Sequence, residues 1–188
     1  MLSEHPATPD RDGNPVGLDR GLEFEALGCF DQVHVLVPDE RVEATWEPPP
    51  SPMLARHFPL RRIVPGSIIL EAFAQLGSLL LEAGAGFARK ALPAWIERAR
   101  FRQPVEGSRL VWYRVQRLQG DAAGAVLEAE ARQAEEVRVT ARIGFVLAPM
   151  SQFFGQEHLL EYRRWIDARP PGRRARRCRR TRRGALGE

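Results

Sequence analysis

One stretch of this 188-residue chain limits what it can fold into: residues 67–88 are apolar almost without interruption. Only Glu71, Gln75 and Glu82 add large polar groups to it. The run is long enough to span a bilayer, but each of these groups is costly in hydrocarbon, which favours a helix buried in a soluble protein. Because such a helix is apolar nearly all round, other elements must cover most of its sides.

The segments on both sides of this helix have the alternation of β-strands. Residues 32–37 and 41–46 alternate around a turn at Asp39–Glu40, which predicts a hairpin, and Gly84 and Gly86 mark the end of the helix. Four further strand-like runs follow, at residues 95–101, 110–118, 126–132 and 137–147. Two strands, a long helix and about four strands predict an α+β fold in which a curved antiparallel sheet wraps around one central helix.

Composition divides the chain into three parts: a polar N-terminal arm (1–22), a folded domain (23–148) and a C-terminal extension (149–188). The net charge of +4 hides a split, because residues 169–188 hold nine arginines and one acid while the body is mildly acidic. The arginine run could contact nucleic acid or an anionic membrane. It has no interleaved aromatic residues, so we expect a disordered appendage and no nucleic-acid partner.

The cell compartment follows from what the sequence lacks. The N-terminus has no basic segment followed by an apolar run, as a signal peptide would. Two cysteines, Cys29 and Cys178, are too few and too far apart for a disulfide framework or a zinc site. We therefore expect a cytoplasmic protein, in which Cys29 is a small core residue.

Candidate chemistry gathers around the start of the apolar helix. His57 lies in an expected loop shortly before the helix entry at Pro65–Gly66, and Glu71 lies about one and a half turns into the helix. Gly66 lets a ligand approach the backbone, and the first N–H groups of a helix carry the partial positive charge that an enolate-like oxyanion needs. Gln75 shares a face with Glu71 at spacing i, i+4 and can orient its carboxyl group.

The surroundings expected for Glu71 also matter to its chemistry. Apolar neighbours favour the protonated form of a carboxyl group, which suits a proton donor. The neighbours in sequence are Ile69, Leu70, Phe73 and Leu76. From the residues alone a structural interpretation stays open, because a loop histidine is often at the surface and a glutamate in an apolar helix can pair with an arginine.

Three segments together carry a family resemblance. The string HFPLRRIVPGSIILEAFAQ at 57–75 resembles the signature of the β-hydroxyacyl-acyl-carrier-protein dehydratases of the hotdog fold: His-Phe-Pro, Pro-Gly, then Glu-Ala-x-Ala-Gln. Residues 96–107 are similar to the family's Phe-Arg-x-Pro-Val strand and turn, and residues 30–33 (FDQV) to its first-strand Val-Asp-Arg-Val. The resemblance covers about residues 30–147.

This resemblance implies a hydro-lyase that converts (3R)-3-hydroxyacyl thioesters to trans-2-enoyl thioesters, in fatty-acid or specialised lipid or polyketide-like biosynthesis. His57 would be the general base at C2, and Glu71 would protonate the departing 3-hydroxyl group. In the family these two residues of one site come from opposite subunits, so a homodimer or a higher even oligomer is implied. The substrate-binding positions carried over are Gly66, whose N–H would hold the thioester oxygen, and Pro65, Gln75 and Phe58.

The resemblance also implies partners. No metal or cofactor is expected, and the acyl chain would ride on acyl carrier protein, an acidic partner, or on coenzyme A. Candidate residues for docking the carrier are Arg61, Arg62, Arg100 and Arg102.

Two departures keep alternatives open. The family usually has Gly-His-Phe-Pro-Gly, whereas Arg56 and Leu60 flank the motif here, and residues 25–29 (EALGC) replace the family's Pro-His-Arg-x-Pro-Phe segment. One alternative is a hotdog acyl thioesterase, which needs an attacking water in place of a leaving hydroxyl group. The other is a non-catalytic hotdog subunit that binds acyl carrier protein or completes a heterodimer.

Overall fold

A computed structural model describes residues 28–153 except 51 and 59. The expected arm at 1–22 and most of the C-terminal extension lie outside these residues. The described chain runs in the order β1 (Gln32–Val37), β2 (Arg41–Trp46), α1 (Pro52–His57), α2 (Gly66–Gly84), β3 (Arg89–Phe101), β4 (Val111–Gly120), β5 (Gly124–Gln133), β6 (Glu136–Pro149) and the short 3₁₀ turn η1 (Met150–Gln152).

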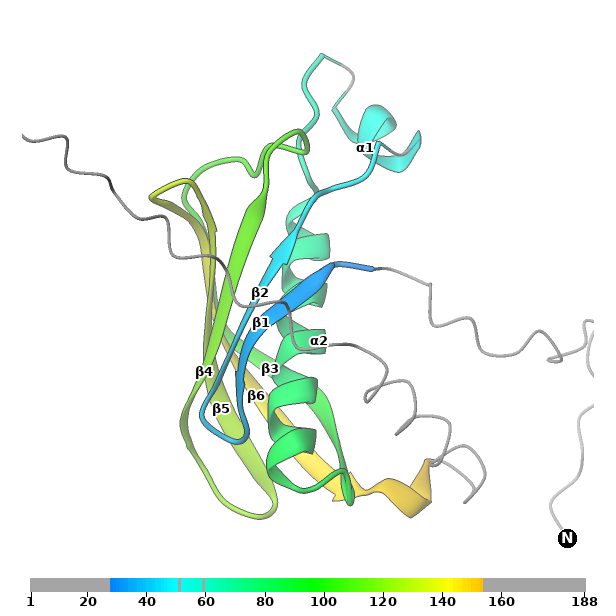
Figure 1. The fold of residues 1–188 in the computed structure, drawn as a ribbon, viewed down its shortest axis with the longest axis vertical. Helices are drawn as coiled ribbons and strands as arrows, with labels where there is room; N and C mark the ends of the chain where they lie inside the picture. The colour runs from blue at the N-terminus through cyan, green and yellow to red at the C-terminus, as the bar shows by residue number, and fades with distance from the viewer. Residues whose placement is uncertain (1–27, 51, 59, 154–188) are drawn as a thin grey trace, which may run out of the picture.

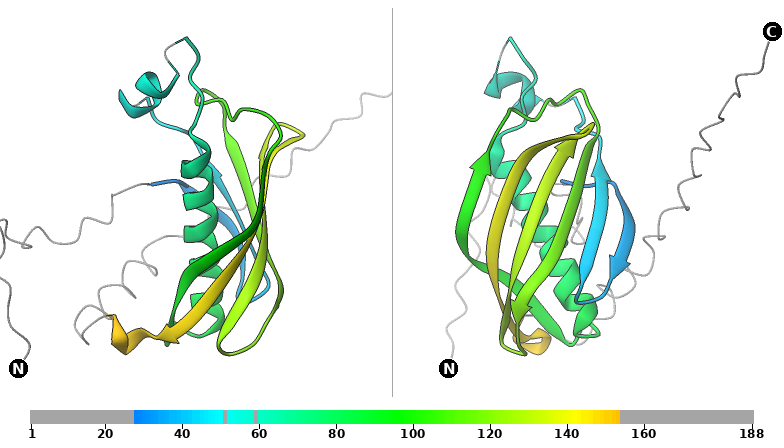
Figure 2. Two further views of the ribbon diagram at one scale, coloured as in Figure 1. Left: turned by 180° about the vertical axis from the view of Figure 1, so that it is seen from behind. Right: turned by 90° about the vertical axis from the view of Figure 1, so that its left-hand side faces the viewer.

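The six strands form one antiparallel sheet in the order β1-β2-β4-β5-β6-β3. Figures 1 and 2 show the sheet curving around α2, which lies along its concave face. The expected α+β architecture, a sheet wrapped around one central helix, is therefore confirmed.

One face of α2 forms the centre of the core. Ile69, Phe73, Leu76 and Leu80 recur at helical spacing and are fully buried against the sheet. Gly77 lets the helix come close, because a Cβ added there would lie 2.6 Å from the Phe145 ring and 2.8 Å from Leu127. By length and composition alone α2 could cross a membrane, but in this fold its apolar face packs on strands.

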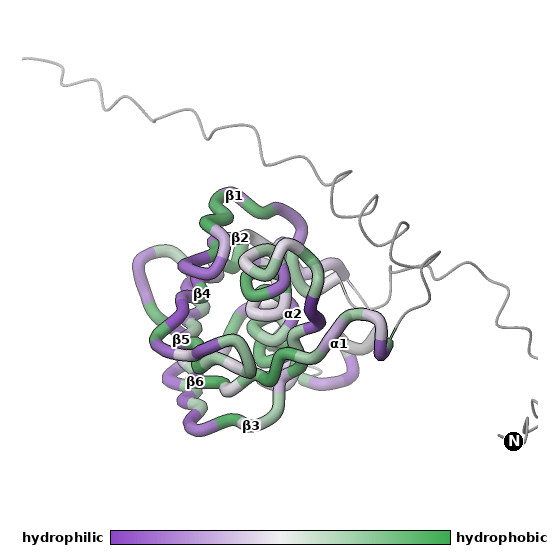
Figure 3. Tube along the Cα trace, turned by 90° about the horizontal axis from the view of Figure 1, so that it is seen from below, coloured by the Kyte–Doolittle hydropathy of each residue, from purple (hydrophilic) through white to green (hydrophobic). Residues whose placement is uncertain are grey.

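Hydropathy follows the same division. Viewed along the helix in Figure 3, hydrophobic stretches gather around α2, and hydrophilic ones lie along the outer side of β4, β5 and β6. Opposite charges pair across that outer face, for example Arg142 with Glu128 and Glu97. The outer face is thus solvated, as a one-sided antiparallel sheet requires.

The hairpin is confirmed residue for residue, and its turn places Asp39 at φ 62°. Two other elements differ from expectation. β3 starts at Arg89 and not at Trp95, and it passes through Pro93. Proline is tolerated there because β3 is an edge strand whose register shifts between Pro93 and Trp95. The second difference is α1, which forms where only a loop or turn was expected.

Candidate active site

His57 is the last residue of α1, so its predicted place in a loop is wrong. The helix can start at Pro52 because proline is accepted at the first helical position, where its missing N–H is not needed. The His57 side chain is exposed, and its ring meets that of Phe58 edge-on with centroids 5.7 Å apart. In Figure 1, α1 stands at one end of the molecule, away from the sheet.

Glu71 has the neighbour that its spacing predicts. Gln75 Nε2 donates a hydrogen bond of 2.9 Å to Glu71 Oε1, and both side chains are partly buried. Three of the four apolar residues expected around Glu71 lie elsewhere. A rotation of about 100° per residue puts Ile69, Phe73 and Leu76 on the opposite side of the helix, against the sheet. Glu71 therefore lies on the side of α2 opposite these core residues, where the Gln75 amide orients it.

The N-terminus of α2 lies beside an aromatic ring. The helix begins at Gly66 after Pro65 and has no side-chain cap. A Cβ at Gly66 would lie 2.5 Å from Cε1 of Phe101 in β3, so this ring needs the glycine. From the sequence we explained the glycine at position 66 by the close approach of a ligand. That explanation overlooked the packing of the Phe101 ring, which is 53% exposed. A half-exposed ring therefore lies over the start of α2, where no side chain caps the helix.

A buried thiol lies within electrostatic reach of Glu71. Burial, and then the Glu71 carboxylate, raise the pKa of Cys29 to about 11. Burial, and then Cys29 and Asp31, raise the pKa of Tyr113 well above its ordinary value. Cys29 is a core residue, as predicted, but the sequence gave no sign of its closeness to Glu71. The raised pKa values leave the Cys29 thiol and the Tyr113 hydroxyl group uncharged at neutral pH.

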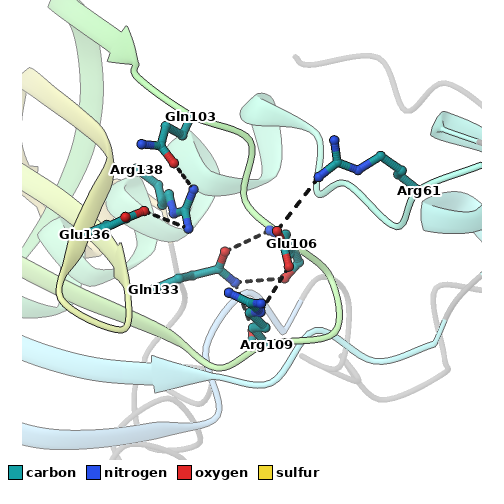
Figure 4. Close-up of polar contacts among 7 residues, drawn as sticks. All are labelled: Arg61, Gln103, Glu106, Arg109, Gln133, Glu136 and Arg138. Atoms are coloured by element: carbon teal, nitrogen blue, oxygen red, sulfur yellow. Dashed lines mark hydrogen bonds and ion pairs between the residues drawn. The ribbon is translucent and has the colours of Figure 1, made fainter.

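The predicted docking arginines are all exposed. Arg61 Nη2 lies 3.9 Å from Glu106 Oε1 (Figure 4), whereas Arg62, Arg100 and Arg102 make no ion pair within the described part of the chain. An isolated bridge between Ile63 and Glu106 holds the Arg61–Arg62 segment beside the chain that follows Arg102. The first two of these arginines, Arg61 and Arg62, thus lie on a segment next to the one that follows Arg100 and Arg102.

The two predicted catalytic groups are not bonded to each other in the described part of the chain. Among the described residues, His57 and Glu71 share no hydrogen bond or ion pair. The residues around His57 are also open to solvent: Arg56 is exposed, Phe58 is 50% exposed and Leu60 is 96% exposed. No group of three or more His, Cys, Asp or Glu side chains that could hold a metal occurs in the described ranges.

The motif-bearing part of the chain has a family match. Residues 48–142 match the FabA-like domain. This chain belongs to the FabA-like family of hotdog dehydratases. The matched range of the FabA-like protein contains α1, α2 and β3, and with them His57, Gly66, Glu71 and Phe101.

One curated relative of this FabA-like protein is the 3-hydroxyacyl-acyl-carrier-protein dehydratase FabZ of Protochlamydia amoebophila. It is 34% identical over 96 residues, which are 51% of this chain and 62% of the relative. The match thus spans less than two thirds of the relative's length.

Solved structures share the fold at low identity. A hot-dog-like protein from Thermanaerovibrio acidaminovorans aligns with a TM-score of 0.52 and 14% identity, over 70% of this chain and 93% of that one. The thioesterase HI1161 from Haemophilus influenzae aligns with a TM-score of 0.51 and 15% identity, over 64% and 80% of the two chains. At this identity the likeness concerns the fold alone.

Proposed function

We propose that this FabA-like protein removes water from (3R)-3-hydroxyacyl thioesters carried on acyl carrier protein and yields trans-2-enoyl thioesters. The observation that carries the proposal is the pairing of Glu71 with Gln75 on α2, preceded by an exposed His57 in the family's motif. The 34% identity to a FabZ dehydratase supports the same reaction. We place it in the cytoplasm, in fatty-acid or specialised lipid biosynthesis.

The reaction needs one base and one acid. His57 takes the C2 proton, the C3–O bond breaks as Glu71 protonates the leaving hydroxyl group, and the C2=C3 double bond forms. The hydrogen bond from Gln75 fixes the Glu71 carboxyl group in one orientation. The N–H of Gly66, at the uncapped start of α2, holds the thioester oxygen as negative charge develops there. One such donor is worth about 3–4 kcal/mol of barrier.

The site is composite in this proposal, with His57 and Glu71 supplied by different subunits of a homodimer or a higher even oligomer. β3 is an edge strand, and it exposes Trp95, Ile96 and Phe101. Such an edge offers unpaired backbone groups and apolar side chains to a second copy. Because Phe101 touches Gly66, a copy seated along β3 reaches the start of α2.

Arg61, Arg62, Arg100 and Arg102 form the proposed docking surface for the carrier. Their guanidinium groups are exposed, and acyl carrier protein is acidic, so attraction steers the encounter. This contribution falls with salt, because the screening length shrinks from about 8 Å at physiological ionic strength to about 3 Å at 1 M. A substrate on coenzyme A would depend less on this surface.

Two other functions fit parts of the observations. Acyl thioester hydrolysis occurs on this fold in the Haemophilus influenzae thioesterase, and it requires an attacking water where the dehydratase releases a hydroxyl group. A non-catalytic subunit is favoured by Arg56 and Leu60, which replace the family's flanking glycines and are exposed.

The deciding experiment is a spectrophotometric assay with crotonyl and longer enoyl thioesters, on carrier protein and on coenzyme A. We expect reversible hydration of the conjugated double bond without release of free thiol. Thiol release would identify a thioesterase. Absence of both reactions over all chain lengths would identify a binding subunit.

A further inference from the structure

A buried amide closes one end of the core. Gln133, the last residue of β5, is 1% exposed and uses both polar atoms of its side chain (Figure 4). Its Oε1 accepts a 2.8 Å hydrogen bond from the Glu106 N–H, and its Nε2 donates to the carbonyl oxygens of Glu106 at 2.8 Å and Arg109 at 3.1 Å. A side chain so bonded has one orientation.

The backbone groups of residues 105–107 form hydrogen bonds on two sides of the chain. Those of Glu106 itself face Gln133, while its neighbours face the segment before α2. The Val64 N–H donates to the Val105 carbonyl at 2.8 Å, and the Gly107 N–H donates to the Arg62 carbonyl at 2.7 Å. The Gln133 amide thus takes the place that the peptide group of a third strand would have in a sheet.

A second side chain from the same hairpin holds the start of this connection. Arg138 of β6 is largely buried and contacts Gln103 Oε1, and its other terminal nitrogen lies 3.0 Å from Glu136 (Figure 4). The Glu106 carboxylate, in turn, lies 3.0 Å from Arg109 and 3.9 Å from Arg61. The end of the β5–β6 hairpin therefore determines where the connection between β3 and β4 lies.

The segment held in this way lies between His57 at the end of α1 and the N-terminus of α2. Residues 62–64 follow α1, which ends at His57, and Val64 directly precedes Pro65 and Gly66 at the start of α2. We propose that Gln133 is a positioning residue: through residues 105–107 it fixes residues 62–64, and with them the placement of His57 relative to the N-terminus of α2. This inference rests on the proposed dehydratase function.

The test uses two variants of the full chain. Gln133→Leu keeps much of the volume but leaves the Glu106 and Arg109 backbone groups without the side-chain partner. We expect faster hydrogen–deuterium exchange at the Val64 and Gly107 amides. Since a displacement of 1 Å can cost about 10²-fold in rate, we expect kcat to fall about 10–100-fold with little change in KM. Val115→Ala, a buried core change in β4, is the control for an equal loss in Tm.

The second variant, Gln133→Glu, gives a readout that loss of stability alone does not move. A protonated carboxyl group has one acceptor and one donor, so it can bond to the Glu106 N–H and carbonyl as the amide does. The ionised form has no donor. The kcat of this variant relative to the unaltered protein should therefore rise as the pH falls. The nearby charged groups Glu106, Arg109 and Arg61 are the same in both proteins.

The outcomes separate this inference from the proposed function. Unchanged exchange at Val64 and Gly107 in folded Gln133→Leu protein overturns the inference whatever the activity. A kcat loss no larger than that of Val115→Ala overturns it too. If Gln133→Leu does not fold, a flat pH ratio for Gln133→Glu overturns it. A wild-type protein without dehydratase activity refutes the proposed function, while amide exchange still tests how residues 62–64 are held.

Discussion

Glu71 and Glu82 belong to the same helix but have different partners. Glu71 is partly buried and accepts its hydrogen bond from the neutral amide of Gln75. Glu82 is fully buried, lies 2.7 Å from Lys90 Nζ, and also accepts from the Ala91 N–H at 3.2 Å. The Glu82 carboxylate is thus tied to a cation and a backbone amide in the core, whereas the Glu71 carboxyl group is oriented by a neutral side chain.

The first prediction concerns the proposed acid and base. His57→Ala and Glu71→Gln should each lower dehydratase turnover by about 10²–10⁴-fold, because each removes one proton-transfer group. Circular dichroism and thermal melting should show that both variants stay folded, since neither side chain belongs to the core. A variant with turnover close to that of the wild type would show that its residue has another role.

The second prediction concerns the Cys29 thiol. Burial and the Glu71 carboxylate raise its pKa to about 11, so alkylation by iodoacetamide should be slow at pH 8 and speed up as the pH approaches 11. Because an unfolded chain releases this proton at lower pH, stability should fall as the pH rises through the same range. Glu71→Gln should speed the alkylation by removing one of the two causes.

A Cys178→Ser background leaves Cys29 as the one thiol to be measured. Urea-unfolded protein gives the upper limit of the alkylation rate. A folded protein that reacts at this limit would contradict the buried position of Cys29.

At the scale of elements, the sequence predicted the helices and strands that depend on local patterns better than those that depend on their place in the fold. The alternation of β1 and β2 and the apolar run of α2 sufficed to place these elements. α1 was missed because the prolines around it indicated a loop, although Pro52 is accepted at its first position. The early start of β3 was missed because Pro93 is compatible with a strand only at a sheet edge, and edge position depends on the whole sheet.

The candidate site divides in the same way. The Glu71–Gln75 pair followed from helical spacing and was found from the sequence. The contact of Phe101 with Gly66 and the bonds of Gln133 to the Glu106 backbone join residues far apart in the chain. No pattern in a single sequence indicates such contacts, because strand order and register decide them.

The third prediction concerns the junction of α2 with β3. Glu82→Ala should lower the free energy of unfolding by about 3–5 kcal/mol, because it leaves the ammonium group of Lys90 without its carboxylate in a largely buried place. Replacing both residues by apolar ones, Glu82→Leu with Lys90→Met, should recover much of this loss. Denaturant titrations of the three proteins measure the differences.

Glu97→Ala is the matched control, because Glu97 pairs with Arg142 at 3.3 Å on the exposed face of the sheet. An exposed pair contributes little, so this variant should unfold almost as the wild type does. Equal losses for Glu82→Ala and Glu97→Ala would contradict the structural role of the buried pair.

At the scale of the whole molecule, the proposed reaction needs more than a single chain. His57 is exposed at the end of α1, Glu71 lies on the side of α2 opposite the buried core residues, and no described hydrogen bond or ion pair joins the two. β3 meanwhile leaves one sheet edge open, with Trp95 and Phe101 at the surface. Both features are what a subunit of a symmetric assembly with shared sites would have.

The fourth prediction follows from shared sites. When His57→Ala and Glu71→Gln subunits are mixed and exchanged, half of the dimers become mixed, and each mixed dimer has one intact site of two. Activity should then return to about a quarter of the wild-type value. Subunit exchange is verified by mass spectrometry of differently tagged chains. No recovery after complete exchange would mean that each site lies within one chain.

Lys90 is the single lysine among 188 residues. The opening of the α2–β3 junction can therefore be measured by proteolysis at one site. A protease specific for lysine has one bond to cut, Lys90–Ala91, which lies where Ala91 pairs with Leu147 and donates to Glu82. Cleavage must await a local opening in which the start of β3 leaves both β6 and α2. The rate at which two fragments accumulate therefore reports that opening in unlabelled protein, and Glu82→Ala should quicken it.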